Sequence, residues 1–145
     1  MTNYDRHLRY LADGQTGFAI MIRSLALKTY GNYVMNTLDD AGLVTEQSTP
    51  AMGVTITSGT ATINGSAADT VSGNHTIGTA HTTLDRYDLV IYDVSASTGA
   101  VVAGTAAASP QVPSPGEARD IPLAIVRVRA AVTKIFNEDI IDVRS

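Results

Sequence analysis

The 145-residue sequence contains no cysteine and no tryptophan, and these two absences exclude several kinds of function. Without cysteine, the chain has no disulfide, thiolate metal site, iron–sulfur cluster or cysteine nucleophile. Without tryptophan, and with only 6% aromatic residues, it has few of the side chains that stack on sugar rings. The sequence therefore predicts a domain that folds without covalent cross-links and needs no oxidising compartment.

Charged residues are also scarce. They make up 17% of the sequence, against roughly a quarter in an average globular domain, and the formal net charge is −4. Lys and Arg are scattered along the chain, so the sequence lacks the basic footprint of a nucleic-acid-binding protein. No apolar run approaches the roughly 20 residues of a membrane helix, and the first residues lack the apolar core of a signal peptide. We therefore expect a soluble protein, made in the cytoplasm, that binds neither nucleic acid nor a membrane.

The sequence is rich instead in Ala, Thr, Val, Ser and Gly. From Val44 onward, apolar residues alternate with Thr, Ser and Asn, and Ser58-Gly59 and Asn64-Gly65 provide turn signals. Short strands joined by such turns are typical of a sandwich or a small barrel. The pattern predicts a mainly β fold, with a β-sandwich or jelly-roll-like domain over residues 44–145.

The second half of this domain predicts a hairpin and then a long crossover. Tyr87–Tyr92 and Ala100–Ala103 flank a short loop that contains Gly, as the strands of a hairpin do. The stretch from Gly104 to Pro122 holds four of the five prolines, which remove hydrogen-bond donors, so we expect an extended crossover. The apolar alternation that follows slips by one residue after Ile125, which predicts a bulged strand, and the last residues predict a short strand or turn.

The first 43 residues are interpreted as an attachment or oligomerisation segment. Apolar residues recur at helical spacing around Ile20–Thr29, where a buried strand is the alternative, and Gly42 follows a second helical pattern over Asn36–Ala41. We therefore expect an N-terminal arm with at most one or two short helices. Tyr and Arg are enriched in protein interfaces, and packing of these side chains against the β-domain is the alternative. The expected interface residues are Tyr4, Arg6, Arg9, Tyr10, Phe18, Arg23, Tyr30 and Tyr33.

The stretch LDRYDLVIYD is the strongest candidate for a site, because Asp85, Asp88 and Asp93 lie close together in it. A glycosidase needs two carboxylates that face one cleft, whereas Asp88 and Asp93 lie on opposite faces of a regular strand. Calcium loops need oxygen donors in a Gly-centred spacing that this stretch lacks. We therefore expect each of the three carboxylates to be replaceable by Asn without loss of assembly function. We interpret the stretch as a strand entrance in which Arg86 forms an ion pair with Asp142.

No other motif points to chemistry. His75 and His81 are six residues apart, but a catalytic zinc ion needs three protein ligands held in place. The sequence also lacks a nucleophile elbow, a phosphate-binding loop and a dinucleotide fingerprint. We therefore expect no catalytic residue, no metal ion and no cofactor.

The order of three stretches carries a resemblance. GLVTEQSTPAMGVTITSGTATING is followed by DRYDLVIYDVSASTGAVVAGTAAASPQVPSPGEARDIPLAIVRVRAAVTKI and then by EDIIDVRS. This succession, from Gly42 to Ser145, resembles a β-rich module of tailed-bacteriophage structural proteins, notably baseplate, tail-fibre and receptor-binding components. The resemblance implies a non-enzymatic virion protein that assembles with other virion proteins as a homo-oligomer, with a trimer favoured.

Two other functions fit the same sequence. A capsid decoration (cement) protein would use a small β-domain and an N-terminal arm in the same way. A carbohydrate-binding host adhesin would recognise a surface glycan through its loops, but the scarcity of aromatic residues disfavours it.

Overall fold

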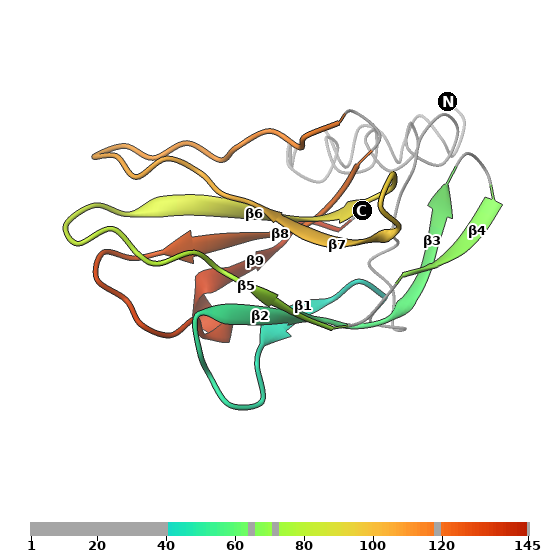
Figure 1. The fold of residues 1–145 in the computed structure, drawn as a ribbon, viewed down its shortest axis with the longest axis horizontal. Helices are drawn as coiled ribbons and strands as arrows, with labels where there is room; N and C mark the ends of the chain where they lie inside the picture. Colours follow the sequence, from blue (N-terminus) through green and yellow to red (C-terminus); the bar gives the residue numbers. More distant parts are fainter. Residues whose placement is uncertain (1–40, 64–65, 71–72, 118–119, 145) are drawn as a thin grey trace, which may run out of the picture.

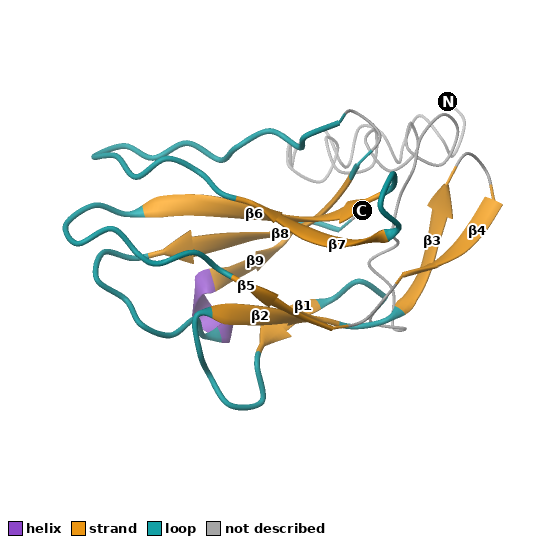
Figure 2. Ribbon diagram, in the orientation of Figure 1, coloured by secondary structure: helices purple, strands orange, loops and turns teal. Residues whose placement is uncertain are grey.

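The computed structural model describes residues 41–63, 66–70, 73–117 and 120–144. Nine strands and one short 3-10 helix make up the secondary structure of these residues, which confirms the mainly β class (Figure 2). In chain order they are β1 (Val44–Glu46), β2 (Gly53–Ile56), β3 (Gly59–Ile63), β4 (Ser66–Thr70), β5 (Gly73–Thr76), β6 (Arg86–Asp93), β7 (Thr98–Val102), β8 (Ile121–Val128), η1 (Asn137–Asp139) and β9 (Ile140–Asp142).

The strands form three antiparallel sheets. One has the order β1-β2-β5, one is the two-stranded ribbon β3-β4, and the largest has the order β7-β6-β8-β9. The three-stranded and four-stranded sheets lie one above the other, and the ribbon extends from one end of them (Figure 1). The segment after β7 runs along the side of β6 that faces away from β2 and β5 (Figure 1).

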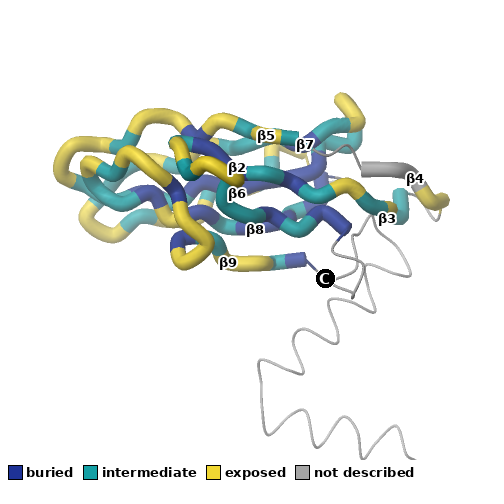
Figure 3. Tube along the Cα trace, turned by 90° about the horizontal axis from the view of Figure 1, so that it is seen from below, coloured by how far each residue is buried: buried dark blue, intermediate teal, exposed yellow. Residues whose placement is uncertain are grey.

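The core lies between the two larger sheets. Val54 and Ile56 of β2 belong to the same buried cluster as Val90 and Tyr92 of β6, so both sheets contribute to it. Figure 3 shows the burial along these strands and the exposed loops at their ends. Each large aliphatic side chain removed from water here contributes about 1.5–3 kcal/mol. This two-layer arrangement is the kind found in a β-sandwich.

The hairpin predicted around residues 95–99 is confirmed. β6 and β7 pair from Leu89↔Val102 to Asp93↔Thr98. The Asp93 Oδ1 atom accepts a hydrogen bond from Ala96 N (3.0 Å), which fixes the turn in the way that Asp commonly does.

The turn at Ser58-Gly59 does not make a hairpin of β2 and β3, because these strands belong to different sheets. The chain passes from one sheet to the ribbon here. A Cβ atom on Gly59 would overlap Ala41, so the close approach of these two backbone segments requires glycine. Close approach, and not hairpin formation, therefore explains the glycine at this position.

The bulge in β8 lies earlier than the sequence pattern indicated. Val90 pairs with Ala124 and Ile91 pairs with Pro122, so Leu123 is the extra residue. Leu123 and Ala124 are both buried, whereas the predicted slip came after Ile125. The physical reason is Pro122: β8 is an inner strand, and proline is accommodated inside a sheet at a bulge.

Of the predicted N-terminal arm, residues 1–43, only Ala41, Gly42 and Leu43 are described. The predicted helix at Ile20–Thr29, the predicted helical turn at Asn36–Ala41 up to residue 40, and all eight expected interface residues lie outside the described residues. The first residue of β1 is Val44, but Ala41 already belongs to the core cluster and Gly42 N donates to Thr57 O at 2.9 Å, so the described domain includes these residues. Within the described part of the chain, none of the helical structure is long and apolar enough to cross a membrane.

Candidate functional site

The acidic stretch at the start of β6 forms two separate ion pairs. Asp85 precedes the strand, Arg86 begins it, and Asp88 follows two residues later. Because residues two apart share a strand face, Arg86 and Asp88 project to the same side, and Asp85 projects to the other. The three charged groups therefore do not converge on one site.

The first pair is buried. Arg86 donates from Nε to Asp88 Oδ1 (2.8 Å) and from Nη2 to Asp88 Oδ2 (3.1 Å), and the exposed fractions of the two side chains are 10% and 0%. This two-pronged geometry is the strong form of an arginine–carboxylate pair. The predicted pairing of Arg86 with Asp142 is therefore wrong.

The buried pair also holds two neighbouring segments. Arg86 donates to the carbonyl oxygens of Gly78 and Thr79, both at 2.7 Å. Asp88 Oδ1 accepts a hydrogen bond from Gly104 N at 3.0 Å. The pair therefore fastens the loop before β6 and the segment after β7 to the strand between them.

Asp142 pairs instead with Arg144. The Arg144 guanidinium donates from Nε to Oδ1 (2.9 Å) and from Nη2 to Oδ2 (2.7 Å), and its Nη1 donates to Ala41 O (2.8 Å). Burial opposes ionisation of Asp142, but the hydrogen bonds from Arg144 outweigh it, so the pKa of the Asp142 carboxyl lies below its usual value.

Register explains why Asp142 does not reach Arg86. Arg86 lies opposite Val128 of β8, and Asp142 lies opposite Ala124. Four residues of strand separate these positions, which is roughly 13 Å. The sequence did contain the correct signal, because Arg86-x-Asp88 and Asp142-x-Arg144 both have the two-residue spacing of one strand face.

The second pair at β6 lies at the surface. Arg127 of β8 donates from Nη2 to Asp85 Oδ2 (2.8 Å), and Ala130 N donates to Asp85 Oδ1 (2.9 Å). The hydrogen bond from Arg127, followed by that from Ala130, lowers the pKa of the Asp85 carboxyl, and Asp85 in turn raises the pKa of Arg127. A carboxylate held in this way is a weak base.

Two further carboxylates hold backbone N–H groups. Asp120 accepts hydrogen bonds from Val94 N (3.3 Å) and Glu117 N (3.0 Å), and Asp139 Oδ2 accepts one from Phe136 N (3.1 Å). Asp139 Oδ1 also lies 2.9 Å from Arg129 Nε, an ion pair without the alignment of a good hydrogen bond. These acids fasten loops to the sheets.

The two histidines occupy different surroundings. His81 Nδ1 accepts hydrogen bonds from Thr83 N (3.2 Å) and Leu84 N (3.1 Å), so His81 closes the turn that leads to β6. His75 lies on β5, opposite Val54, and its ring lies against Gly99 of β7. Among the described residues, no group of three His, Cys, Asp or Glu is placed to hold a metal ion.

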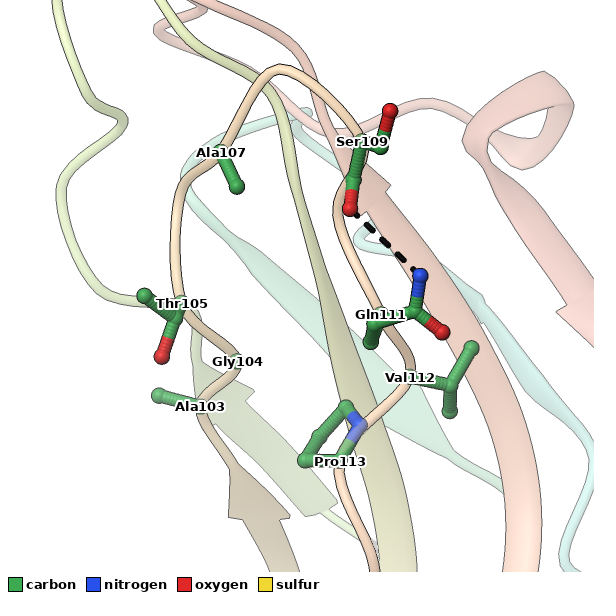
Figure 4. Close-up of a pocket in the computed structure, with 8 residues that line it drawn as sticks. All are labelled: Ala103, Gly104, Thr105, Ala107, Ser109, Gln111, Val112 and Pro113. Carbon is green, nitrogen blue, oxygen red and sulfur yellow. Dashed lines mark hydrogen bonds between the residues drawn. The ribbon is translucent and has the colours of Figure 1, made fainter.

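The described surface includes two shallow grooves. One, of about 390 Å³, is lined by Glu46, Phe136, Asn137 and Glu138. The other, of about 370 Å³, lies between the two limbs of the segment after β7 (Figure 4). The described residues that line it are small or uncharged: Ala103, Gly104, Thr105, Ala107, Ser109, Gln111, Val112 and Pro113. Its hydroxyl groups have no general base among these lining residues.

Comparison with known proteins gives no family for this chain. No protein-family model matches the sequence, and searches of curated proteins and of solved structures found no significant match. The function is therefore inferred from the site geometry and the sequence.

Proposed function

We propose that the protein is a non-enzymatic structural component of a bacteriophage virion, in the tail, the baseplate or a fibre. The main support for the proposal is that carboxylates of the described domain bind arginines or backbone N–H groups of the same chain. Asp85, Asp88 and Asp142 each bind an arginine of the same chain, and other carboxylates hold backbone N–H groups. An acid–base catalyst would present such carboxylates to its substrate. Here they hold loops in place instead, as expected in a structural module.

The sequence supplies the rest of the proposal. The succession of motifs from Gly42 to Ser145 resembles a module of phage tail and baseplate proteins, and the low charge favours faces covered by other protein. We therefore propose assembly with other virion proteins and a closed homo-oligomer, with a trimer favoured. The residues that line the groove of Figure 4 include no aromatic side chain for sugar stacking, and this supports a structural role over the host adhesin.

The test is the location of the chain in a particle. Gold-labelled antibody against the purified protein is applied to virions from a host lysate and viewed by electron microscopy. Label at the tail or baseplate supports the proposal, and label spread over the head replaces it with capsid decoration. Virions without label, together with free protein in the lysate, contradict both.

A further inference from the structure

The outer face of the four-stranded sheet is apolar. Leu89 and Ile91 of β6 alternate with the core residues Val90 and Tyr92, so they project away from the core, and their exposed fractions are only 4% and 2%. A sheet with one solvated face normally carries polar residues at such positions. This face is therefore built to be covered.

A row of apolar residues crosses this face from one edge to the other. Val102 of β7 lies opposite Leu89, Leu89 lies opposite Ile125 of β8, and Ile125 lies opposite Ile141 of β9. Directly opposite residues of an antiparallel sheet have neighbouring side chains. The row is therefore one continuous surface.

The described residues cover only part of this row. The segment after β7 lies on this side of β6 (Figure 1), and Ala107 N donates to Asp85 O at 3.1 Å. At the far end, Ile141 keeps 51% of its surface exposed. Ile125, between the two, is half-buried. Within residues 41–144, the β8–β9 half of the face is thus left largely uncovered.

The N-terminal part of the chain joins the domain beside this uncovered half. Arg144 binds both Asp142 at the end of β9 and the carbonyl oxygen of Ala41, the first described residue. The 40 residues before Ala41 include FAIMIRSLAL, which has eight apolar residues among its ten. The chain therefore holds an apolar segment that is tethered at the edge of an apolar face.

We propose that Phe18–Leu27 of a second copy packs on the exposed half of this outer face, at Ile125 and Ile141. The segment is assigned to a second copy because an exchange of this kind joins the copies of the proposed homo-oligomer. Each copy then gives a segment to one neighbour and a face to the other. Such a head-to-tail contact closes into a ring when the rotation allows it, as in a trimer. This inference rests on the proposed assembly role and names the surface that performs it.

Cross-linking in this cysteine-free chain tests the contact directly. Two sets of full-length chains are prepared, one with Ile141→Cys and one with Ile22→Cys or Leu25→Cys. Equal amounts are mixed under mild oxidation, and the products are identified by mass spectrometry. A disulfide between position 141 and position 22 or 25 joins two different chains by design. The matched control is Val112→Cys, which has a similar exposure of 44% but lies in the segment after β7.

The expected result is a heterodimer yield through position 141 that exceeds the yield through position 112 by tenfold or more. Equal yields overturn the proposal, and so does a product dominated by links between two copies of position 141, which indicates face-to-face packing. As a second measurement, Ile141→Thr keeps a strand-forming residue and removes the apolar contact. Light scattering at tens of micromolar should show an oligomer for the parent chain and tenfold weaker association for this variant.

A parent chain that stays monomeric, or a variant that associates like its parent, also overturns the inference. These measurements use purified chains and need no virion. A protein that cross-links as described but labels no particle therefore contradicts the proposed function alone. A protein that labels the tail but links equally through both positions contradicts only the inferred contact.

Discussion

Asp85 and Asp88 are three residues apart, each binds an arginine, and yet the two ion pairs have different physical roles. The exposed fractions of Asp85 and its partner Arg127 are 31% and 53%, whereas those of Asp88 and Arg86 are 0% and 10%. A surface pair contributes little, because water and salt screen it. Removal of one member of a buried pair costs several kcal/mol, because the remaining charge loses its partner. Burial, more than ion-pair geometry, separates the two.

The two carboxylates also fasten different parts of the molecule. Asp88 is buried, and its ion pair with Arg86 forms hydrogen bonds with the backbone of Gly78, Thr79 and Gly104. Asp85 acts at the surface, where it holds Arg127 and the backbone of Ala130. Substitutions at the inner set should therefore affect the whole domain, and those at the outer set should affect one turn.

The largest effect is expected for Asp88→Asn. The substitution leaves the Arg86 guanidinium buried without a countercharge, so the free energy of unfolding should fall by about 3–5 kcal/mol. Denaturant unfolding followed by circular dichroism measures the change.

The matched control is Asp93→Asn, because Asn also provides an oxygen for Ala96 N in the turn. Its effect should stay within about 0.5 kcal/mol. Equal effects of the two substitutions would show that the buried pair gives no special stability. The sequence predicted no loss of assembly function for Asp88→Asn, and the buried pair adds the prediction that the substitution lowers stability.

Gly104→Ala should have the next largest effect. A Cβ atom at this position would overlap Tyr87 O, which belongs to the backbone of β6 and cannot rotate away. The strand and the segment must separate, at a cost of about 1–3 kcal/mol, and the bond from Gly104 N to Asp88 weakens with it.

Gly116→Ala serves as the control in the same segment. Its added Cβ atom would meet only Asp120 Oδ2, at an ordinary 3.8 Å. The thermal midpoint should stay unchanged or rise slightly, since alanine restricts the unfolded chain. A Gly104→Ala variant as stable as Gly116→Ala would contradict the close packing after β7.

Much of the β6–β7 region was predictable from the sequence. The alternation in β6 and the Gly-containing loop predicted the hairpin. The prolines predicted a crossover without strands from Gly104 to Pro122, but β8 already begins at Ile121, so Pro122 lies inside a strand. These signals are local, since period-two burial and proline geometry act within a few residues. Two further features also have local signals in the sequence. Pro122 indicates the bulge in β8, and the two-residue spacing of Arg86 and Asp88 indicates that these side chains share a strand face.

Other features were beyond the sequence because they depend on register between distant strands. Arg127 meets Asp85 only because Tyr87 lies opposite Arg127 in the sheet. The bond between Arg144 and the carbonyl of Ala41 joins positions 103 residues apart. Alternation shows which face a residue occupies, but it does not show which strand lies beside it.

Asp85→Asn should have a small effect that depends on pH. The pKa of Asp85 is lowered in the folded chain, so its contribution is present at neutral pH and is lost as the pH falls below about 4, through the lowered value. Thermal melts of the parent and the variant should differ slightly at pH 7 and converge near pH 2. Added salt should reduce the difference at pH 7. A difference that is the same at both pH values would show that the charge of Asp85 is not involved.

Controls aside, the smallest effect is expected for Ala131→Gly, in the turn that Asp85 fastens, and it is a gain in stability. Ala131 has a φ of 57°, in the left-handed region where a Cβ atom is unfavourable and glycine is not. Relief of this strain exceeds the added freedom of the unfolded chain, so stability should rise by about 0.5 kcal/mol. Ala130→Gly is the control: Ala130 lacks a positive φ, and its substitution should lower stability. In a chain that also carries Asp85→Asn, the gain from Ala131→Gly should shrink, because the turn is then free to relax without glycine. Additive effects in this double-mutant cycle would show that Asp85 does not hold the turn in its strained form.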